Sequence, residues 1–296
     1  MKIFLTGAAG LIGSSAYRAL RRRGWTVHGC DLRVPSAKME DVSQRDLREP
    51  LDPYVFCGYD VVVHLAGHPD LGCAPDDRLL AENSAINEHV FAAALASGVR
   101  KIVFASTAQV FNGRERYDAG FQPPAPGYLP LDEKMPANAV NAYSRSKWIA
   151  EQNLKTMTDQ HEIAAVVLRL PWVLTPKLFL HATRRTVAQS TRAEAFSFLM
   201  LADTVAVIVA ACERMTAGYR CYFPAAQENL WWVSAEQARA EWFANVPLRP
   251  GFKKLSSLVD LTALERDLHW RPRPVRNWKG TIVCARNFIS RLRQRK

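Results

Sequence analysis

The sequence predicts an α/β fold with a doubly wound parallel sheet and a smaller C-terminal lobe. Over the first 110 residues, short apolar runs alternate with helical patterns. The runs are nearly continuous in Val, Ile and Phe, which is typical of parallel strands covered on both faces. A glycine-rich turn, TGAAGLIG, joins the first run to the first helical pattern. Together these features favour alternating strands and helices over an all-helical or all-β chain.

The elements follow in order along the chain. Strands are expected at residues 2–7, 26–31, 60–67, 101–107 and 163–170. Helices are expected from Leu11 to about Arg23, over residues 83–98, and through the segment AYSRSKWIAEQ (142–152). The apolar stretch 196–212 is interpreted as a strand end followed by a buried helix, with Asp203 near the helix start.

Two regions break this alternation. Residues 113–136 contain five prolines and are expected to form a lid or a binding loop. After Pro171 the pattern becomes less regular. We therefore predict a dinucleotide-binding Rossmann domain at residues 1–170, and a substrate-binding lobe at residues 171–296 that is interleaved with the end of the sheet.

Composition narrows the class of protein. With 296 residues and 48% hydrophobic residues, the chain can bury a full core. Its six cysteines form no C-x-x-C pair, so we expect no metal site and a reducing compartment, the cytoplasm. No targeting segment is expected at the start, MKIFLTGAAG. The stretch 196–212 is shorter than the roughly 20 residues that span a bilayer, so no membrane association is expected.

The net charge of +11 is concentrated at the C-terminus. Residues 270–296 contain nine Lys or Arg and no acidic residue. A nucleic-acid-binding protein usually spreads basic residues over a docking face with a recognisable motif. We therefore interpret the segment ARNFISRLRQRK as a solvated last helix and expect no nucleic-acid partner. Attraction of this segment to an anionic substrate or partner stays open.

The first turn predicts a dinucleotide site. Gly7, Gly10 and Gly13 let the backbone turn tightly and approach a pyrophosphate, and the helix that begins with Leu11 and Ile12 offers its N–H groups to the anion. The next strand ends at Asp31, whose carboxylate can accept hydrogen bonds from ribose hydroxyls and repel a 2′-phosphate. This favours NAD over NADP, although Arg33 could pair with such a phosphate.

Tyr143 and Lys147 form a second motif. Residues four apart share one face of a helix, and a nearby ammonium lowers the pKa of a phenol. Such a pair can act as an acid/base catalyst near neutral pH. The alternative is an ordinary exposed helix face.

Four motifs occur in the order and approximate spacing of one family: Gly7-x-x-Gly10-x-x-Gly13, HLAG (64–67), FASTAQVF (104–111) and Tyr143-x-x-x-Lys147. The chain resembles the extended short-chain dehydrogenase/reductases, the family of NAD-dependent sugar epimerases and dehydratases, over essentially its whole length. The family's segment that leads into its catalytic helix resembles residues 131–147, LDEKMPANAVNAYSRSK. Its C-terminal segment resembles residues 267–273, DLHWRPR.

The resemblance implies catalytic roles. Tyr143 would take or give the proton of the substrate hydroxyl. Lys147 would lower the pKa of Tyr143 and hold the nicotinamide ribose. Thr107 would orient the substrate oxygen, with Ser106 as the neighbouring candidate.

The resemblance also implies further cofactor contacts. Asp46 and Leu47 match a segment that contacts the adenine. A second set matches backbone that runs along the cofactor: Leu65, Ala66, Gly67 and Pro171. Asn83 matches a helix asparagine of the family. For Asp46 and Asn83, a surface or capping role stays open.

The substrate side departs from the family pattern. Candidate substrate contacts are Thr107, Ala108, Gln109, Trp172 and Arg184. Sugar dehydratases of the family have an Asp-Glu pair where this chain has Ala108 and Gln109, which speaks against dehydration. Trp172 replaces an asparagine that lies near the diphosphate in many nucleotide-sugar enzymes, and it could instead fill a seam between lobes.

Arginines after residue 180 could also contribute to the substrate side. Arg184, Arg185 and Arg192 could clamp a phosphate or carboxylate, or lie solvated at the surface. The histidines have no metal-like spacing and receive no role: His64, His68 and His181.

The leading hypothesis is an NAD-dependent oxidoreductase or epimerase that acts on a sugar or nucleotide sugar, with a homodimer expected by analogy. The first alternative is a dehydrogenase of a small free sugar or sugar acid, similar to uronate dehydrogenases. The second is a sensor that binds dinucleotide without catalysis.

Overall fold

The computed structural model describes residues 1–33, 39–112, 124–182, 191–214 and 217–275. Its centre is a seven-stranded sheet in the order β3-β2-β1-β4-β5-β6-β9, with every neighbouring pair parallel. The strands are β1 (Lys2–Thr6), β2 (Thr26–Asp31), β3 (Val42–Gln44), β4 (Val61–His64), β5 (Lys101–Thr107), β6 (Ala164–Leu170) and β9 (Gly218–Tyr222). This confirms the predicted doubly wound α/β class.

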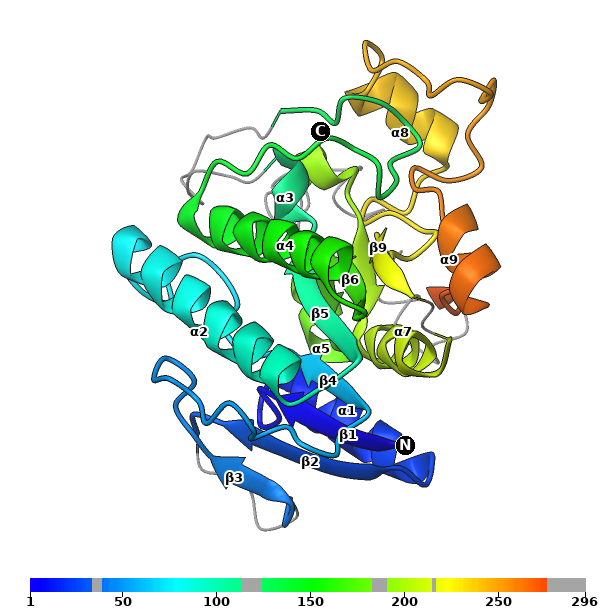
Figure 1. The fold of residues 1–296 in the computed structure, drawn as a ribbon. Helices are drawn as coiled ribbons and strands as arrows, with labels where there is room; N and C mark the ends of the chain where they lie inside the picture. Colours follow the sequence, from blue (N-terminus) through cyan, green and yellow to red (C-terminus); the bar gives the residue numbers. More distant parts are fainter. Residues whose placement is uncertain (34–38, 113–123, 183–190, 215–216, 276–296) are drawn as a thin grey trace.

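Helices cover both faces of the sheet (Figure 1). On one face, α2 (Asp76–Ala96) packs beside α4 (Ala142–Gln160). On the other face, α1 (Leu11–Arg22) packs beside α7 (Leu201–Arg214). The shorter described helices are α3 (Gln109–Asn112), α5 (Pro176–Ala182), the 3₁₀ turn η1 (Arg192–Glu194), α8 (Ala235–Trp242) and α9 (Thr262–Leu268).

Strand β1 shows why its sequence is almost continuously apolar. Ile3 and Leu5 are fully buried in a core that also contains Leu20 of α1. Phe4, between them, is buried in a second core together with Val90 of α2. Successive side chains of a strand point to opposite faces, and both faces of this sheet are covered. Every position of such a strand therefore favours an apolar residue.

The predicted elements and the observed ones differ mainly at their ends. The helix expected at 83–98 begins at Asp76, after Pro75. Its first turn is polar and hides the apolar pattern, but two acidic residues there suit a helix N-terminus. The strand expected at 60–67 ends at His64. Beyond it, the Leu65 N–H still donates to the backbone and side chain of Thr6 at the end of β1.

The part of the chain after Pro171 contributes a small second sheet. Strand β7 (Trp172–Leu174) pairs in parallel with β8 (Phe198–Met200). Helix α7 follows β8 directly, with Asp203 in its first turn, as the sequence predicted. Strand β9 then returns to the main sheet and pairs with β6.

The proline-rich segment is described only from residue 124 onwards. There it forms isolated bridges that pair Leu129 with Leu248 and Leu131 with Val259. Residues 113–123 and the basic segment 276–296, for which a loop and a helix were expected, lie outside the described residues. Within the described part of the chain, no helix has the length and apolar character needed to cross a membrane.

Candidate functional site

The glycine turn after β1 is closed by contacts that only glycine allows. Gly7 has φ +69°, and a Cβ there would lie 2.8 Å from the Ala66 backbone nitrogen. A Cβ on Gly13 would lie 2.0 Å from the Gly7 carbonyl oxygen. Gly10 stands just before α1, so the first N–H groups of that helix, including those of Leu11 and Ile12, have no partner within it. The turn is a tight cradle beneath a helix N-terminus, which fits a pyrophosphate.

Asp31 ties this cradle to the end of β2. It is 7% exposed, and its Oδ2 accepts a hydrogen bond from the Ala9 N–H at 2.9 Å. Its Oδ1 accepts from the Arg33 backbone N–H at 3.0 Å and from Arg33 Nε at 3.3 Å. The guanidinium that complicated the choice between NAD and NADP therefore lies paired with Asp31, while its side chain is 66% exposed.

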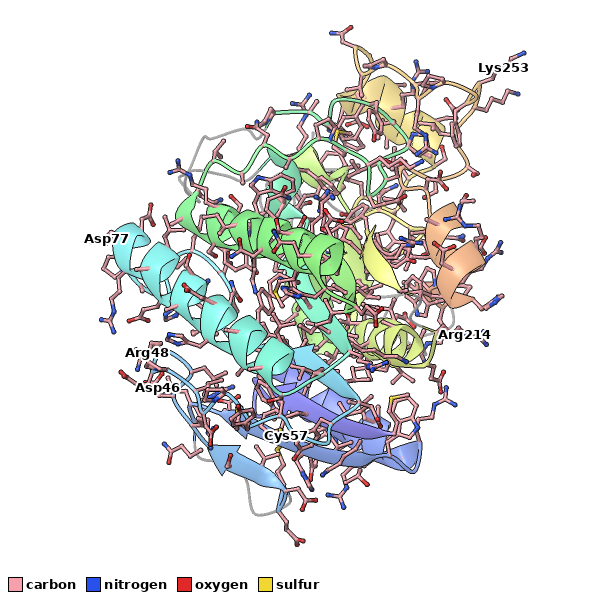
Figure 2. All side chains as sticks on the ribbon, in the orientation of Figure 1. Asp46, Arg48, Cys57, Asp77, Arg214 and Lys253 are labelled. Carbon is pink, nitrogen blue, oxygen red and sulfur yellow. The ribbon has the colours of Figure 1, made fainter. Side chains whose placement is uncertain are left out.

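Asp46 and Leu47 occupy different environments. Asp46 lies beside Arg48 near β3 (Figure 2) and accepts from Arg48 Nε at 2.9 Å. The Arg48 hydrogen bonds lower the pKa of Asp46. Leu47 is buried in the core, and its carbonyl accepts from His89 Nδ1 at 3.1 Å. The carboxylate of Asp46 is thus held in a surface ion pair.

The backbone after β4 is held by a neutral buried cluster of Thr6, His64 and Asn87. Thr6 Oγ1 lies 2.7 Å from His64 Nδ1, and His64 Nε2 lies 3.0 Å from Asn87 Oδ1. Complete burial lowers the pKa of His64 to about 3, so the ring is neutral. Thr6 Oγ1 in turn accepts from the N–H groups of Leu65 and Ala66. His64, which received no role from its spacing, positions the backbone along the predicted cofactor path.

Gly67 and Asn83 extend that path towards α4. Gly67 has φ +134°, and a Cβ there would lie 3.0 Å from Asn83 Oδ1. Asn83 Oδ1 accepts from the His68 N–H at 2.7 Å, and Asn83 Nδ2 donates to Ser146 Oγ at 3.2 Å. Asn83 therefore joins the loop after β4 to α4, the structural role that the sequence had left open.

Thr107, Tyr143 and Lys147 meet at the carboxyl end of β5. Thr107 ends that strand, and the other two lie on α4, whose N-terminus is fixed by a capping box of Asn141 and Ser144. Burial raises the pKa of Tyr143, and the Thr107 side chain, which lies next to the phenol, opposes this rise. Lys147 Nζ donates to the Ala105 carbonyl at 2.9 Å. The fold brings together the three residues that the sequence singled out.

The pKa of Tyr143 is shifted opposite to the sequence expectation. Burial raises the pKa of the phenol, and the nearby carboxylate of Asp70 raises it further. Burial also lowers the pKa of Lys147 to about 8, against the opposing effect of Glu151. Spacing alone predicted a lowered tyrosine pKa, but it could not reveal that both groups are inside the protein. In the free chain the tyrosine is therefore held as the neutral phenol.

Ser106 belongs to a buried charged cluster with Glu151 and Arg169. Its hydroxyl donates to Glu151 Oε1 at 2.5 Å. Arg169 donates to the same carboxylate through Nε and Nη2, the latter at 2.7 Å, while Glu151 is fully buried. Arg169 also donates to the carbonyls of Glu133 and Met135. The structure thus leaves Thr107 as the hydroxyl that faces Tyr143.

The remaining substrate candidates are spread over several environments. Ala108 is fully buried, and its N–H donates to the Leu170 carbonyl at 2.9 Å. Pro171 is buried after β6, and Trp172 is half-buried at the start of β7. Arg192 Nη2 donates to the Trp242 carbonyl at 2.9 Å. Arg184, Arg185 and the His181 side chain lie outside the described residues.

One group near the site was missed by the sequence analysis. Asp70, in the loop after β4, lies close enough to Tyr143 to influence its pKa and accepts a hydrogen bond from Gln109 Nε2 at 3.3 Å. Glu194 of η1 and Cys73 also raise the pKa of Tyr143, after Asp70 in size. No motif marks these residues, because their proximity to Tyr143 depends on how segments far apart in the sequence fold together.

The sequence pattern of the NAD dependent epimerase/dehydratase family matches residues 3–214. The chain belongs to this family. It is 28% identical over 188 residues to a UDP-glucose 4-epimerase of Azospirillum brasilense, covering 57% of this chain and 48% of that protein. It is 28% identical over 191 residues to an L-arabinose 1-dehydrogenase (NAD(P)(+)) of Haloferax volcanii, covering 59% and 68%. The chain thus spans about half the length of the epimerase and two thirds of the dehydrogenase.

Solved structures share the fold. A short-chain dehydrogenase/reductase superfamily protein from Agrobacterium tumefaciens with bound NAD has a TM-score of 0.70 and 20% identity, with full coverage of both chains. A UDP-galactose 4-epimerase has a TM-score of 0.64 and 23% identity, covering 92% of this chain and 93% of that one. These likenesses agree with the parallel sheet and its helices.

Proposed function

We propose that this chain is an NAD-dependent enzyme that transfers hydride at a hydroxyl-bearing carbon of a sugar or nucleotide sugar. The observation that carries the proposal is the meeting of Thr107, Tyr143 and Lys147 beside the glycine cradle. Family membership and the relatives that act on sugars support it. The bound cofactor would supply the hydride acceptor, and the protein would supply position and a path for the proton.

The cradle supports a dinucleotide as the cofactor. Gly7 and Gly13 leave no room for a side chain, so the backbone can approach a diphosphate, and α1 begins directly above it. Asp31 stands at the end of β2, where a carboxylate can accept hydrogen bonds from ribose hydroxyls and disfavours a 2′-phosphate. We therefore assign NAD rather than NADP, with the segment 65–67 and Pro171 along the cofactor.

The proton would move through Tyr143. During oxidation, Tyr143 acts as the phenolate and takes the proton of the substrate hydroxyl, while Thr107 holds the substrate oxygen by a hydrogen bond. During reduction, the Tyr143 hydroxyl returns the proton. The Lys147 ammonium favours the phenolate by its charge. Ala108 and Gln109 carry no acid or base at the positions where sugar dehydratases of the family have an Asp-Glu pair, which speaks against an elimination.

The free-sugar alternative is favoured by one residue and one relative. Trp172 stands where many nucleotide-sugar enzymes of the family have an asparagine near the substrate diphosphate, and an L-arabinose 1-dehydrogenase is among the relatives. An epimerase returns the hydride to its substrate, whereas a dehydrogenase releases the oxidised product. Thr107, Tyr143 and Lys147 serve both reactions equally.

We further infer that residues 1–170 hold the dinucleotide and residues 171–296 hold much of the substrate. The second range supplies η1, which contacts α3 next to Thr107. A homodimer through α2 and α4 is proposed by analogy, supported by the exposed apolar side chains of Ile149 on α4 and Val140 just before it. The cysteines in the described part of the chain are free thiols, which supports a reducing, cytoplasmic location.

Two measurements on the purified chain test these proposals. Native mass spectrometry detects retained NAD, and NMR spectroscopy identifies the products of its reactions with UDP-, TDP- and GDP-sugars, free sugars and uronic acids. Retained NAD together with conversion of one nucleotide sugar to its epimer would support an epimerase. An empty protein that reduces added NAD with one free sugar would support the dehydrogenase. Binding of NAD without turnover of any compound would leave the sensor function, and failure to bind NAD would contradict all three.

A further inference from the structure

Gln109 forms a bridge between two segments that flank the catalytic tyrosine. Its Nε2 donates to Asp70 Oδ1 at 3.3 Å, in the loop after β4. Its Oε1 accepts from Asn141 Nδ2 at 3.3 Å. Asn141 is the N-cap of α4, and its Oδ1 accepts the Ser144 N–H at 2.7 Å. One amide thus connects the loop after β4 with the first turn of the helix that carries Tyr143.

The bridge also fixes a negative charge. Asp70 Oδ1 accepts from the Leu71 N–H at 2.8 Å as well as from Gln109, so the carboxylate is held in one orientation. Among the titratable groups that act on Tyr143, Asp70 has the largest effect, followed by Glu194 of η1 and Cys73 of the same loop. On its own helix, Tyr143 is followed one turn later by Lys147, which donates to Ala105. The position of the Asp70 carboxylate therefore affects the pKa of Tyr143.

We propose that Gln109 is a positioning residue that clamps Asp70 beside Tyr143 and locks this loop to the N-cap of α4. The effect of this clamp on catalysis rests on the proposed function, whereas the hydrogen-bonded bridge does not depend on it. It assigns Gln109 a role through Asp70 and Asn141, in place of the direct substrate contact that the sequence suggested.

Three substitutions separate charge from position. Asp70→Asn keeps an oxygen that accepts from Gln109 and Leu71 but removes the charge. Gln109→Ala removes the bridge to α4 and leaves the Asp70 carboxylate with its other contacts, which include the Leu71 N–H. Gln109→Glu places a second carboxylate next to Asp70, which repels it and adds negative charge near Tyr143. Gln44→Ala is the matched control, because Gln44 donates to the Leu32 carbonyl at the edge of the sheet.

The first readout needs no activity. In the full chain, hydrogen–deuterium exchange of peptides covering 68–74 and 141–147 should accelerate severalfold in Gln109→Ala. It should stay at the wild-type rate in Asp70→Asn and Gln44→Ala. Unchanged exchange in Gln109→Ala would overturn the clamp even if the enzyme proves inactive on every sugar. The two proposals can therefore fail separately.

The second readout is the pH dependence of kcat/KM for oxidation, which rises as Tyr143 loses its proton. The pKa of a phenol falls when its surroundings become less negative. The rise in kcat/KM should therefore move to lower pH by about 0.5–1 pH unit in Asp70→Asn, and by less in Gln109→Ala. In Gln109→Glu it should move to higher pH. The double variant Gln109→Ala/Asp70→Asn should match Asp70→Asn alone. Shifts of the same sign for Gln109→Ala and Gln109→Glu, or no shift in Asp70→Asn, would overturn the proposal.

Discussion

Two buried polar clusters lie under the site, and they are built from opposite kinds of groups. The neutral cluster of Thr6, His64 and Asn87 supports the backbone after β4. The charged cluster of Ser106, Glu151 and Arg169 fastens α4 to β5 and β6. A loop is thus positioned by neutral hydrogen bonds, whereas the helix that carries Tyr143 is positioned by an ion pair. An unpaired buried charge costs more folding free energy than a lost neutral hydrogen bond. Substitutions in the charged cluster should therefore destabilise the protein more than substitutions in the neutral cluster.

Arg169→Met should give the largest loss of stability. It leaves the fully buried Glu151 carboxylate without its cation, which costs about 3–5 kcal/mol of unfolding free energy. Urea unfolding followed by circular dichroism measures the change. The double variant Arg169→Met/Glu151→Leu should recover most of the loss, because no charge is then left buried. A single variant as stable as the wild type would remove the distinction between the clusters.

His64 should make the neutral cluster sensitive to acid. Its folded pKa of about 3 lies below the ordinary value of 6.5, so the unfolded chain takes up this proton first as the pH falls. The stabilisation is complete above about pH 6.5 and is lost as the pH falls towards 3. Between pH 7 and pH 4, wild type should therefore lose about 1–3 kcal/mol more than His64→Gln.

The control for this pH effect is His161→Gln. His161 is exposed at the end of α4 and should leave the pH dependence of unfolding unchanged. If His64→Gln and His161→Gln show the same dependence on pH as the wild type, His64 is not held neutral in the folded chain.

Lys155→Ala should give the smallest loss of stability. Lys155 pairs with Asp159 at 2.7 Å, but both side chains are more than half exposed. Such a pair one turn apart on a helix contributes about 0.3–0.5 kcal/mol. Thermal unfolding at low and high salt should show a small difference that salt removes. A loss as large as that of Arg169→Met would mean that burial does not govern these ion pairs.

The sequence predicted best where local pattern and chemistry coincide. The glycine turn, Asp31 and the Tyr143–Lys147 pair follow from residue types at fixed spacing, and the structure places them together at one edge of the sheet. The strands β3, β7 and β8 have only three residues each, which is too short for a periodic pattern to show. Such strands exist because their neighbours pair with them.

Burial and long-range pairing were beyond the reach of the sequence. Glu151 and Arg169 pair because α4 turns one particular face towards β6, and neither residue has a motif of its own. The expected fall in the pKa of Tyr143 assumed an accessible pair, whereas burial reverses the direction in the free chain. The Gln109 bridge depends on the path of the loop after β4. These features require the three-dimensional arrangement of elements distant in the sequence.

The most direct test of the account is Tyr143→Phe, compared with the control Tyr54→Phe. Tyr54 is 67% exposed and has no part in the proposed mechanism. Both variants should bind NAD as the wild type does. With the sugar that the wild type converts, Tyr143→Phe should lose roughly 10²–10⁴-fold in kcat, because the proton of the substrate hydroxyl has no acceptor. Tyr54→Phe should keep full turnover. Wild-type turnover in Tyr143→Phe would contradict the assignment of Tyr143 as the acid/base and, with it, the proposed mechanism.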